Sequence, residues 1–340
     1  MTDASDDGVI PPVPARGSAV PSTPDAADPG LQTQIRAARS EFELQVAHAR
    51  AEFEEANARI KQRTGRDLIL ATVIGLAIGA VVLASLLFVK WPFVIVGGGV
   101  ALLGVFEFSR ALQSAGRRVD VIPQLLGAVF ILLSAYYLDL WLHWVALIVT
   151  VVVAIVWRLI AQMVVRDGRV YAAVVEDVLI AGFLPIYVPF LASLALVLLR
   201  QEGGEWWVLS FLIVAIASDT GAYATGLTFG RHPMAPRISP KKTWEGFAGA
   251  ALASVVAGVL LAWLMLGLPW WTGIIFGLVV LATATAGDLG ESMLKRDLGI
   301  KDMSSWLPGH GGVLDRLDSI LPSAVAALAL FYLLTPLAVS

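Results

Sequence analysis

The sequence GDLGESMLKRDLGIKDMSSWLPGHGGVLDRLDS, residues 287–319, separates two long apolar runs and is dense in charged residues and glycine. Its first half carries polar residues spaced three and four apart, which a helix would place on one face: Asp288, Glu291, Ser292 and Lys295. A glycine-rich turn follows at 308–312, where positive φ and close approach of the backbone to a ligand are allowed. Asp315 and Asp318 would again share a helix face. These residues predict a ligand site rather than a packed core.

This stretch resembles the signature of the CDP-diacylglycerol synthases, also called phosphatidate cytidylyltransferases. The family pattern is Ser, two residues, Lys-Arg, four residues, Lys-Asp, a spacer, His-Gly-Gly and Asp-Arg-x-Asp. Every fixed position and spacing is filled here: Ser292, Lys295-Arg296, Lys301-Asp302, Leu307-Pro308, His310-Gly311-Gly312 and Asp315-Arg316-Leu317-Asp318. So many constrained positions are far more specific than a lone glycine motif.

The composition indicates a membrane protein. The 340 residues have a mean hydropathy of +0.76 and are only 15% charged, whereas soluble domains carry roughly 25% charge. The chain has no cysteine, which excludes disulfides and thiolate metal sites. The first 60 residues contain no apolar segment typical of a cleavable signal peptide. We therefore predict an all-α, polytopic membrane protein.

The N-terminal part is of a different character. Residues 1–30 are rich in Pro, Ala, Ser, Asp and Gly and predict a disordered tail. Residues 31–66 carry a heptad-like apolar stripe and predict a cytoplasmic helical extension. A solvated helix against the membrane domain and a self-associating coiled coil, which would give a homodimer, both remain open. Residues 67–340 form the predicted transmembrane catalytic domain.

Crossing a bilayer takes about 20 apolar residues, and the chain supplies about nine such runs. They lie at 68–89, 92–109, 122–138, 141–157, 178–199, 206–228, 245–267, 270–290 and 317–337. The run from 122 to 157 is long enough for one helix, but Asp139 and His143 favour a hairpin near 139–141. Pro185 and Pro189 predict a kinked rather than a broken helix.

The distribution of basic residues predicts the orientation. With nine spans and a cytoplasmic N-terminus, the outside segments hold only Lys90 and Arg200, and the other basic loop residues lie inside. We expect a multi-pass protein of the inner membrane whose polar loops and active site face the cytoplasm, where nucleotides are found.

Ionisable residues inside apolar spans are costly and often mark function. Glu107 is one, although a helix-end carboxylate at the membrane interface is an equal alternative. Asp219, in the sequence IASDTGAYATG, and Asp288 are two more, for which single interhelical hydrogen bonds are the simpler alternative.

The segment ISPKKTWEG, residues 238–246, predicts an anion site. Hydroxyls and ammoniums precede a helix expected to begin near Thr243–Glu245: Ser239, Lys241, Lys242 and Thr243. The alternative is a basic anchor at the membrane surface. SDTGAY followed by SPKKTWEG is similar to a second region shared by the synthases, so the resemblance covers roughly residues 207–320.

The resemblance implies transfer of the cytidylyl group of CTP to the membrane lipid phosphatidate, with Mg²⁺ as cofactor. It implies a metal-binding and catalytic set of Asp288, Asp315 and Asp318, with Asp219 in support. Phosphates would be bound by Lys242, Lys295, Arg296 and Arg316, and substrate also by Ser292, His310, Gly311 and Gly312. An exposed turn residue is the alternative for His310, and a monovalent cation beside Mg²⁺ is left open.

Two other functions compete with this interpretation. A CTP-dependent lipid kinase of the dolichol or phytol kinase type would transfer the γ-phosphate to an alcohol. An ion-coupled transporter would use the buried carboxylates, but the chain shows no internal repeat of the kind common in transporters. Nucleic-acid binding is not expected, because the basic residues lie at loop ends without interleaved aromatic residues.

Overall fold

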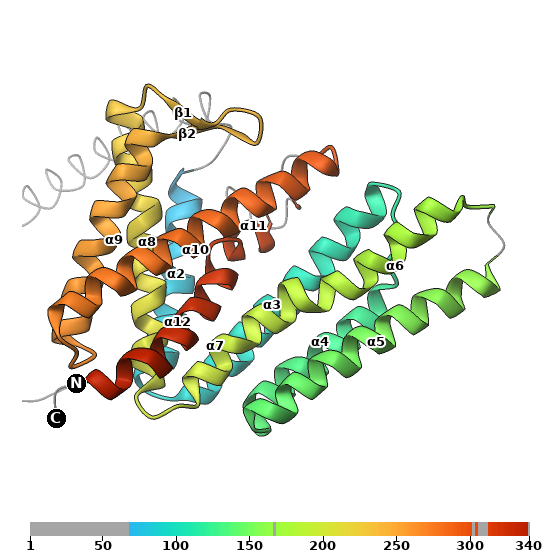
Figure 1. Ribbon diagram of the computed structural model, residues 1–340, viewed down its shortest axis with the longest axis horizontal. Helices are drawn as coiled ribbons and strands as arrows, with labels where there is room; N and C mark the ends of the chain where they lie inside the picture. Colours follow the sequence, from blue (N-terminus) through green and yellow to red (C-terminus); the bar gives the residue numbers. More distant parts are fainter. Residues whose placement is uncertain (1–67, 166–167, 301–302, 305–311, 339–340) are drawn as a thin grey trace, which may run out of the picture. The chain divides into compact units, whose positions relative to one another are not determined.

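The computed structural model describes residues 68–165, 168–300, 303–304 and 312–338. This part of the chain is mostly helical, with one short β-hairpin (Figure 1). The predicted disordered tail at 1–30 and the predicted helical extension at 31–66 lie outside the described residues, so both stay predictions.

The first half of the described chain consists of helices that follow one another through short turns. They are α2 (Leu68–Leu87), α3 (Lys90–Ser114), α4 (Val121–Tyr137), α5 (Leu140–Val164), α6 (Tyr171–Pro185), the π-helical segment η1 (Ile186–Phe190) and α7 (Leu191–Leu199). The second half contains α8 (Gly204–Phe229), β1 (Pro233–Ala235), β2 (Ser239–Thr243), α9 (Trp244–Leu264), α10 (Trp270–Asp297), α11 (Leu314–Leu317), α12 (Ile320–Leu334) and the 3₁₀ segment η2 (Thr335–Leu337).

Within the described residues, seven helical runs are long and apolar enough to cross a membrane. They are α3, α5, α6 to α7, α8, α9, α10 and α11 to η2. The apolar helix α4 is shorter, between Val121 and Tyr137. The predicted multi-pass membrane architecture is confirmed, whereas the count of nine and the cytoplasmic N-terminus stay predictions.

The hairpin expected near 139–141 is present, since α4 ends at Tyr137 and α5 begins at Leu140. Asp139 caps α5, because its Oδ1 accepts a hydrogen bond from the Leu142 N–H at 2.9 Å. His143 is buried one turn later. Its two ring nitrogens lie 2.8 Å from the Ser134 hydroxyl and 3.0 Å from the Ser193 hydroxyl, which satisfies its polar atoms inside the bundle.

The helical run from Tyr171 to Leu199 continues through both prolines, as expected. Proline removes a backbone N–H and crowds the preceding turn, and the chain accommodates this with the π-helical segment η1. Val188 in this segment packs near Gly104 of α3, so the irregular turn is part of a helix contact.

Two boundaries differ from the sequence prediction in ways that matter for the site. Helix α3 extends to Ser114 instead of ending at 109, which moves Glu107 from a helix end into the helix interior. The all-α prediction missed the antiparallel β1–β2 hairpin between α8 and α9, because its strands are short and contain no alternating apolar pattern.

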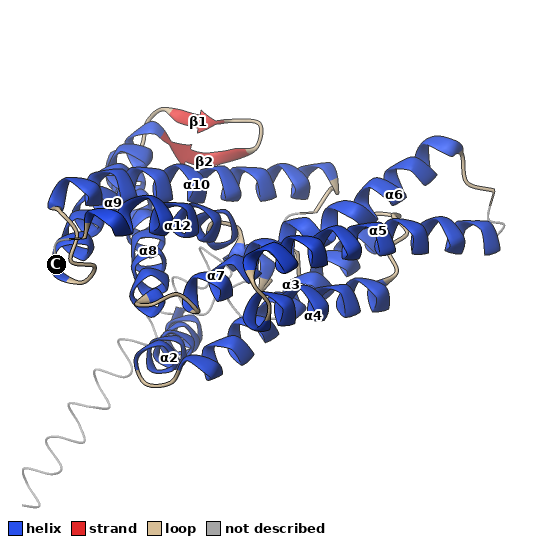
Figure 2. Cartoon of the chain, turned by 60° about the horizontal axis from the view of Figure 1, so that its bottom comes forward, coloured by secondary structure: helices blue, strands red, loops and turns tan. Residues whose placement is uncertain are grey.

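The helices pack in two neighbouring groups, seen in both Figure 1 and Figure 2: α8, α9, α10 and α12 form one, and α3 to α7 the other. One hydrophobic cluster spans both groups, and in it Trp207 makes edge-to-face contacts with Phe276 and Phe331. A second hydrophobic cluster joins α3 and the π-helical segment η1 to Leu314 of α11. Through this second cluster, the start of the last helical run packs directly on α3.

Candidate active site

A cavity of about 480 Å³ lies between α8, the β-hairpin, α9, α10 and the start of the α11–α12 run. Its polar lining combines both signs of charge: Ser218, Asp219, Lys241, Lys242, Thr243, Thr285, Asp288, Lys295, Asp315, Arg316, Asp318 and Ser319. Small residues and a few larger ones, among them Tyr223 of α8 and Phe247 of α9, complete the wall. The cavity therefore suits a ligand that is itself highly charged.

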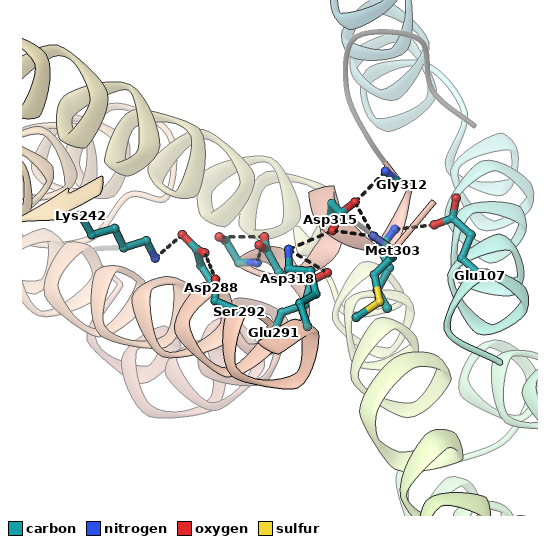
Figure 3. A network of polar contacts seen from close by, with 12 residues as sticks. Glu107, Lys242, Asp288, Glu291, Ser292, Met303, Gly312, Asp315 and Asp318 are labelled. Atoms are coloured by element: carbon teal, nitrogen blue, oxygen red, sulfur yellow. Dashed lines mark hydrogen bonds and ion pairs between the residues drawn. The ribbon is translucent and has the colours of Figure 1, made fainter. Parts of the chain in front are cut away.

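The β-hairpin places the cationic side chains of Lys241 and Lys242 in one wall of this cavity. Strand β2 ends at Thr243, whose hydroxyl accepts a hydrogen bond from the Gly246 N–H at 3.1 Å and caps α9. The helix thus begins where the sequence predicted. Lys242, just before the cap, forms an ion pair with Asp288 of α10 (Figure 3). The Thr243 cap and the ion pair with Asp288 together hold the Lys242 ammonium near the N-terminus of α9.

Side chains from both neighbouring helices hold the hairpin. Glu245 Oε2 accepts hydrogen bonds from the N–H groups of Arg231 (3.1 Å) and His232 (3.2 Å), which fixes the base of the hairpin. Arg296 Nε donates to the Ile238 carbonyl oxygen at 3.3 Å, near the hairpin turn. Arg296 therefore contacts the hairpin instead of lining the cavity.

The predicted polar face of α10 is present. Asp288 and Lys295 line the cavity, and the Ser292 hydroxyl lies 3.4 Å from Asp288 Oδ1. Glu291 is fully buried behind them and pairs with Lys295, whose Nζ lies 3.5 Å from Glu291 Oε1. Lys295 consequently sits between two carboxylates, since Asp315 is its second partner.

Asp315 has partners on both oxygens. Its Oδ1 accepts a hydrogen bond from Lys295 Nζ at 2.9 Å. Its Oδ2 accepts from the N–H groups of Gly312 at 2.7 Å and Met303 at 3.2 Å (Figure 3). Asp315 thus joins the lysine of α10 to the chain segments that lead into α11.

Asp318 reaches the cavity through a close helix contact. A Cβ at Gly287 would lie 2.1 Å from the Asp318 carbonyl oxygen, so only glycine allows this approach of α10 to α12. Asp318 Oδ1 accepts a hydrogen bond from the Ser319 N–H at 2.6 Å. Asp318 lines the cavity together with Asp219 of α8 and Asp288 of α10, so three separate chain segments each bring one carboxylate to the cavity wall.

Glu107 contributes from α3, outside the region that carries the signature. It is only 2% exposed. Its Oε1 accepts a hydrogen bond from the Ser304 hydroxyl at 2.5 Å, and its Oε2 accepts from the Leu314 N–H at 2.9 Å. Glu107 is therefore a buried residue of the helix interior and not the helix-end carboxylate that was one of its two alternatives.

Residues 69–334 match the model of the cytidylyltransferase family. The chain belongs to this family. It is 42% identical over 278 residues to the phosphatidate cytidylyltransferase of Mycobacterium bovis, which covers 78% of this chain and 88% of that protein. Its identity to the phosphatidate cytidylyltransferase of Mycobacterium leprae is 40% over 288 residues, 80% of this chain and 90% of that protein. Its identity to the phosphatidate cytidylyltransferase of Haemophilus influenzae is 31% over 295 residues, which cover 80% of this chain and 98% of that protein.

In this member of the cytidylyltransferase family, most of the residues singled out from the sequence converge on one cavity. Those that line it are Asp219, Lys241, Lys242, Thr243, Asp288, Lys295, Asp315, Arg316 and Asp318. Ser292 and Gly312 contact lining residues through Asp288 and Asp315. Ser239 and Arg296 belong to or contact the hairpin without lining the cavity. His310 and Gly311 lie outside the described residues, as do Lys301 and Asp302.

Two buried carboxylates have contacts near the site that the sequence pattern does not reveal. They are Glu107 of α3 and Glu291 of α10. Both are charged residues inside apolar spans, and this signal was available for each. The hydrogen-bond partners of Glu107 could not be found in this way, because Ser304 and Leu314 lie about two hundred positions after it in the sequence.

The Mg²⁺ ion that the sequence resemblance implies can be tested against these side chains. Among the described residues, no three or more His, Asp or Glu side chains form a ready-made metal site. Mg²⁺ in nucleotide enzymes commonly takes one or two protein carboxylates and completes its shell with phosphates and water. Asp288 and Asp318 meet this requirement, because both line the cavity, Asp288 from α10 and Asp318 from the turn between α11 and α12. The donor set therefore fits a Mg²⁺ ion brought with a nucleotide.

Proposed function

We propose that this chain transfers the cytidylyl group of CTP to phosphatidate, giving CDP-diacylglycerol and pyrophosphate for phospholipid biosynthesis. The observation that carries the proposal is a single cavity, built from helices long enough to cross a membrane, that unites carboxylates and ammoniums. Its relatives of similar length carry the name of this enzyme. A lipid and a nucleotide would meet at such a site.

The chemistry asks little of a general base. A phosphate monoester has a second pKa near ~6, so the phosphatidate headgroup is largely dianionic at pH 7. One of its oxygens forms a bond to the α-phosphorus of CTP, and the bond between that phosphorus and the bridging oxygen to the β-phosphate breaks. Pyrophosphate leaves with the bonding electron pair. The protein must therefore bring two anions together in line and neutralise their charge.

The cationic residues supply this neutralisation. Lys242 and Lys295 present ammoniums at the cavity wall, each held by a carboxylate, Asp288 and Asp315 respectively. Lys241 and Arg316 add two more positive charges to the lining. We propose that these groups bind the phosphates and stabilise the charge that develops on the leaving pyrophosphate, where fixed positive charges are most effective.

The residues proposed to hold Mg²⁺ are Asp288, Asp315 and Asp318, with Asp219 in support. When bound, the ion neutralises phosphate oxygens and helps to orient the reacting groups. Asp315 keeps a role in the set although it also anchors backbone N–H groups, because a carboxylate offers about four acceptor positions. A monovalent cation at the same site is a further part of the proposal that an assay in potassium-free buffer can test.

We also propose that the protein lies in the inner membrane with this cavity open to the cytoplasm. The positive-inside distribution supports it, since the basic residues of the hairpin and of the end of α10 lie at one end of the helices. We further propose that residues 31–66 form a coiled coil that joins two copies of the chain, because they carry a heptad-like apolar stripe.

The test is nucleotide turnover by the purified full-length protein with phosphatidate, Mg²⁺, and CTP labelled separately at the α- and γ-phosphates. The proposal expects the α-label in lipid and release of pyrophosphate, with activity lost in EDTA and restored by Mg²⁺. Entry of the γ-label into lipid would instead show a lipid kinase. No transfer in folded protein would reopen the transporter alternative.

A further inference from the structure

Two carboxylates hold the same pair of chain segments. Glu107 accepts hydrogen bonds from the Ser304 hydroxyl and from the Leu314 N–H, at 2.5 and 2.9 Å. Asp315 accepts from the Met303 and Gly312 N–H groups, at 3.2 and 2.7 Å. Each carboxylate therefore binds one residue from 303–304 and one from 312–314. Two separate helices, α3 and α11, provide these carboxylates.

The surroundings of Glu107 are apolar and tightly packed. Val105 and Phe108 of α3 belong to one buried cluster with Leu314. A charged or polar group in such surroundings is costly unless it is hydrogen-bonded, and both oxygens of Glu107 have partners. A hydrophobic residue would pack here without needing partners. Packing alone therefore does not account for a carboxylate at this position.

Gly312 lies between the two carboxylates. A Cβ at Gly312 would be 2.9 Å from Glu107 Oε2 and 3.0 Å from Asp315 Oδ2. The glycine N–H is bound to Asp315, while its Cα faces Glu107. The backbone that donates to Asp315 therefore lies directly against Glu107.

Asp315 carries this connection to the cavity. Its other oxygen, Oδ1, holds Lys295 Nζ at 2.9 Å, and Lys295 lines the cavity. Figure 3 shows the sequence of contacts, from Glu107 through the backbone near Gly312 and Met303 to Asp315. The chain of contacts runs from a helix outside the signature region to a phosphate-binding ammonium.

We infer that Glu107 is a positioning residue for cytidylyl transfer, acting through the backbone at Gly312 and Leu314 on Asp315 and thereby on Lys295. Glu107 itself touches no substrate. The inference rests on the proposed function, since it assigns Lys295 to the phosphates of that reaction. Its effect belongs to the transition state, because Lys295 must meet charge that develops as pyrophosphate departs.

The experiment compares Glu107→Leu with Glu107→Gln in the purified full-length protein. Leucine keeps the volume and removes both acceptors. Glutamine keeps an oxygen for the Leu314 N–H, and its amide can donate to the Ser304 hydroxyl oxygen. We expect Glu107→Leu to lower kcat by about 10–100-fold, as for other residues that orient catalytic groups, with little change in the KM for CTP. Glu107→Gln should retain most of the kcat.

Asp177→Asn is the matched control. Asp177 is also fully buried, and its Oδ1 accepts a backbone N–H, that of Arg118, at 3.0 Å. It holds the connection between α3 and α4, away from the cavity lining. We expect this variant to lower the Tm while kcat stays near that of the wild type.

Ser304→Ala covers the case in which Glu107→Leu fails to fold. It removes one donor to Glu107 and leaves the Leu314 N–H contact in place. We expect kcat to fall by less than in Glu107→Leu, with little change in the KM for CTP, because one of the two contacts of Glu107 remains. Wild-type kcat in Ser304→Ala would overturn the inference.

Three further results would also overturn it. They are wild-type kcat in Glu107→Leu, equal losses of kcat in the Leu and Gln variants, and a loss of kcat in Asp177→Asn as large as that in Glu107→Leu. The wild-type protein separates the two levels of the proposal. Absence of α-label transfer by the wild type rejects the proposed function, whereas transfer that is insensitive to Glu107 rejects only the positioning role.

Discussion

At the scale of single residues, the charges of the cavity are arranged in pairs. Lys242 pairs with Asp288, and Lys295 pairs with Asp315 at 2.9 Å. The side chains of these residues are between 8% and 31% exposed, so the pairs are screened by water much less than surface pairs. Removing one partner leaves the other charge without compensation, which is more harmful than the loss of an exposed ion pair.

The first prediction concerns Asp315→Asn. Asparagine has one acceptor oxygen, so it cannot serve both Lys295 and the two N–H donors that Asp315 binds. We expect turnover to fall by on the order of 100-fold, with expression and membrane insertion unchanged. The measurement is α-label transfer to phosphatidate in detergent. Asp297→Asn, at the exposed end of α10, is the control, and near-normal turnover in Asp315→Asn would contradict the assignment.

A second prediction at this scale concerns Lys242→Met. The substitution keeps the length of the side chain and removes the charge that meets Asp288 and, in our proposal, a phosphate. We expect the KM for CTP to rise about tenfold, because one charge-assisted hydrogen bond is worth about 1.5 kcal/mol. Lys90→Met serves as the control, since Lys90 pairs with Glu205 outside the cavity. A KM for CTP equal to that of the wild type would remove Lys242 from the phosphate contacts.

Spacing along the sequence located the residues of α10 and α11 that converge on the cavity, because helical periodicity is local. Asp288 and Lys295 could therefore be placed on one face, as the structure has them. Arg296 is adjacent in sequence but lies about a quarter turn away, and it contacts the hairpin instead. Whether a signature residue touches substrate or supports a neighbouring segment depends on tertiary contacts, and these are not local.

At the scale of elements, the contact between α10 and α12 decides where two of the carboxylates meet. Asp288 follows Gly287 directly, and the Asp318 carbonyl oxygen lies against that glycine. Helix α10 can approach α12 this closely only where it has no side chain. The sequence alone assigns no role to Gly287, since a helix interior offers no sign of which glycine faces a neighbour.

The prediction at this scale is that Gly287→Ala separates α10 from α12. The new Cβ would lie 2.1 Å from the Asp318 carbonyl oxygen and 2.8 Å from Pro322 Cγ. We expect a destabilisation of about 1–3 kcal/mol, as for other overpacked sites, together with a large loss of turnover. Thermal unfolding in detergent and α-label transfer measure the two effects.

Gly290→Ala is the matched control on the same helix. A Cβ there meets no atom within 4 Å, so the alanine should be neutral or slightly stabilising through its higher helix propensity. Equal losses in Gly287→Ala and Gly290→Ala would show that the glycines act on helix formation and not on this contact.

At the scale of the whole molecule, the apolar runs predicted a bundle of membrane helices, and the structure confirms that architecture. The loop charges predict a cytoplasmic N-terminus, which stays a prediction. The family match covers residues 69–334, so it begins at the first described helix, α2. The part of the chain that resembles the family therefore lies from α2 onward.

The corresponding prediction is that deletion of residues 1–60 leaves catalysis largely intact. The described residues of the cavity all come from 218–319, and the family match starts after the deleted segment. We expect the kcat of correctly inserted, purified protein to stay within about twofold of the full chain, which corresponds to about 0.4 kcal/mol. Size-exclusion chromatography of the same sample shows whether the extension sets the oligomeric state. Loss of turnover in the inserted protein would make the extension part of the enzyme.

The long separation between Glu107 and Leu314, 207 positions, has a consequence for biogenesis. At a synthesis rate of about 5–20 residues per second, Glu107 enters the membrane roughly 10–40 s before its backbone partner leaves the ribosome. An unpaired carboxylate in an apolar environment is costly, so the nascent chain has to shelter it during this interval, in the insertion machinery or against water. A chain interrupted before α11 never completes the pair. In such a fragment the unpaired Glu107 carboxylate is a feature by which membrane quality control can distinguish it from the complete chain.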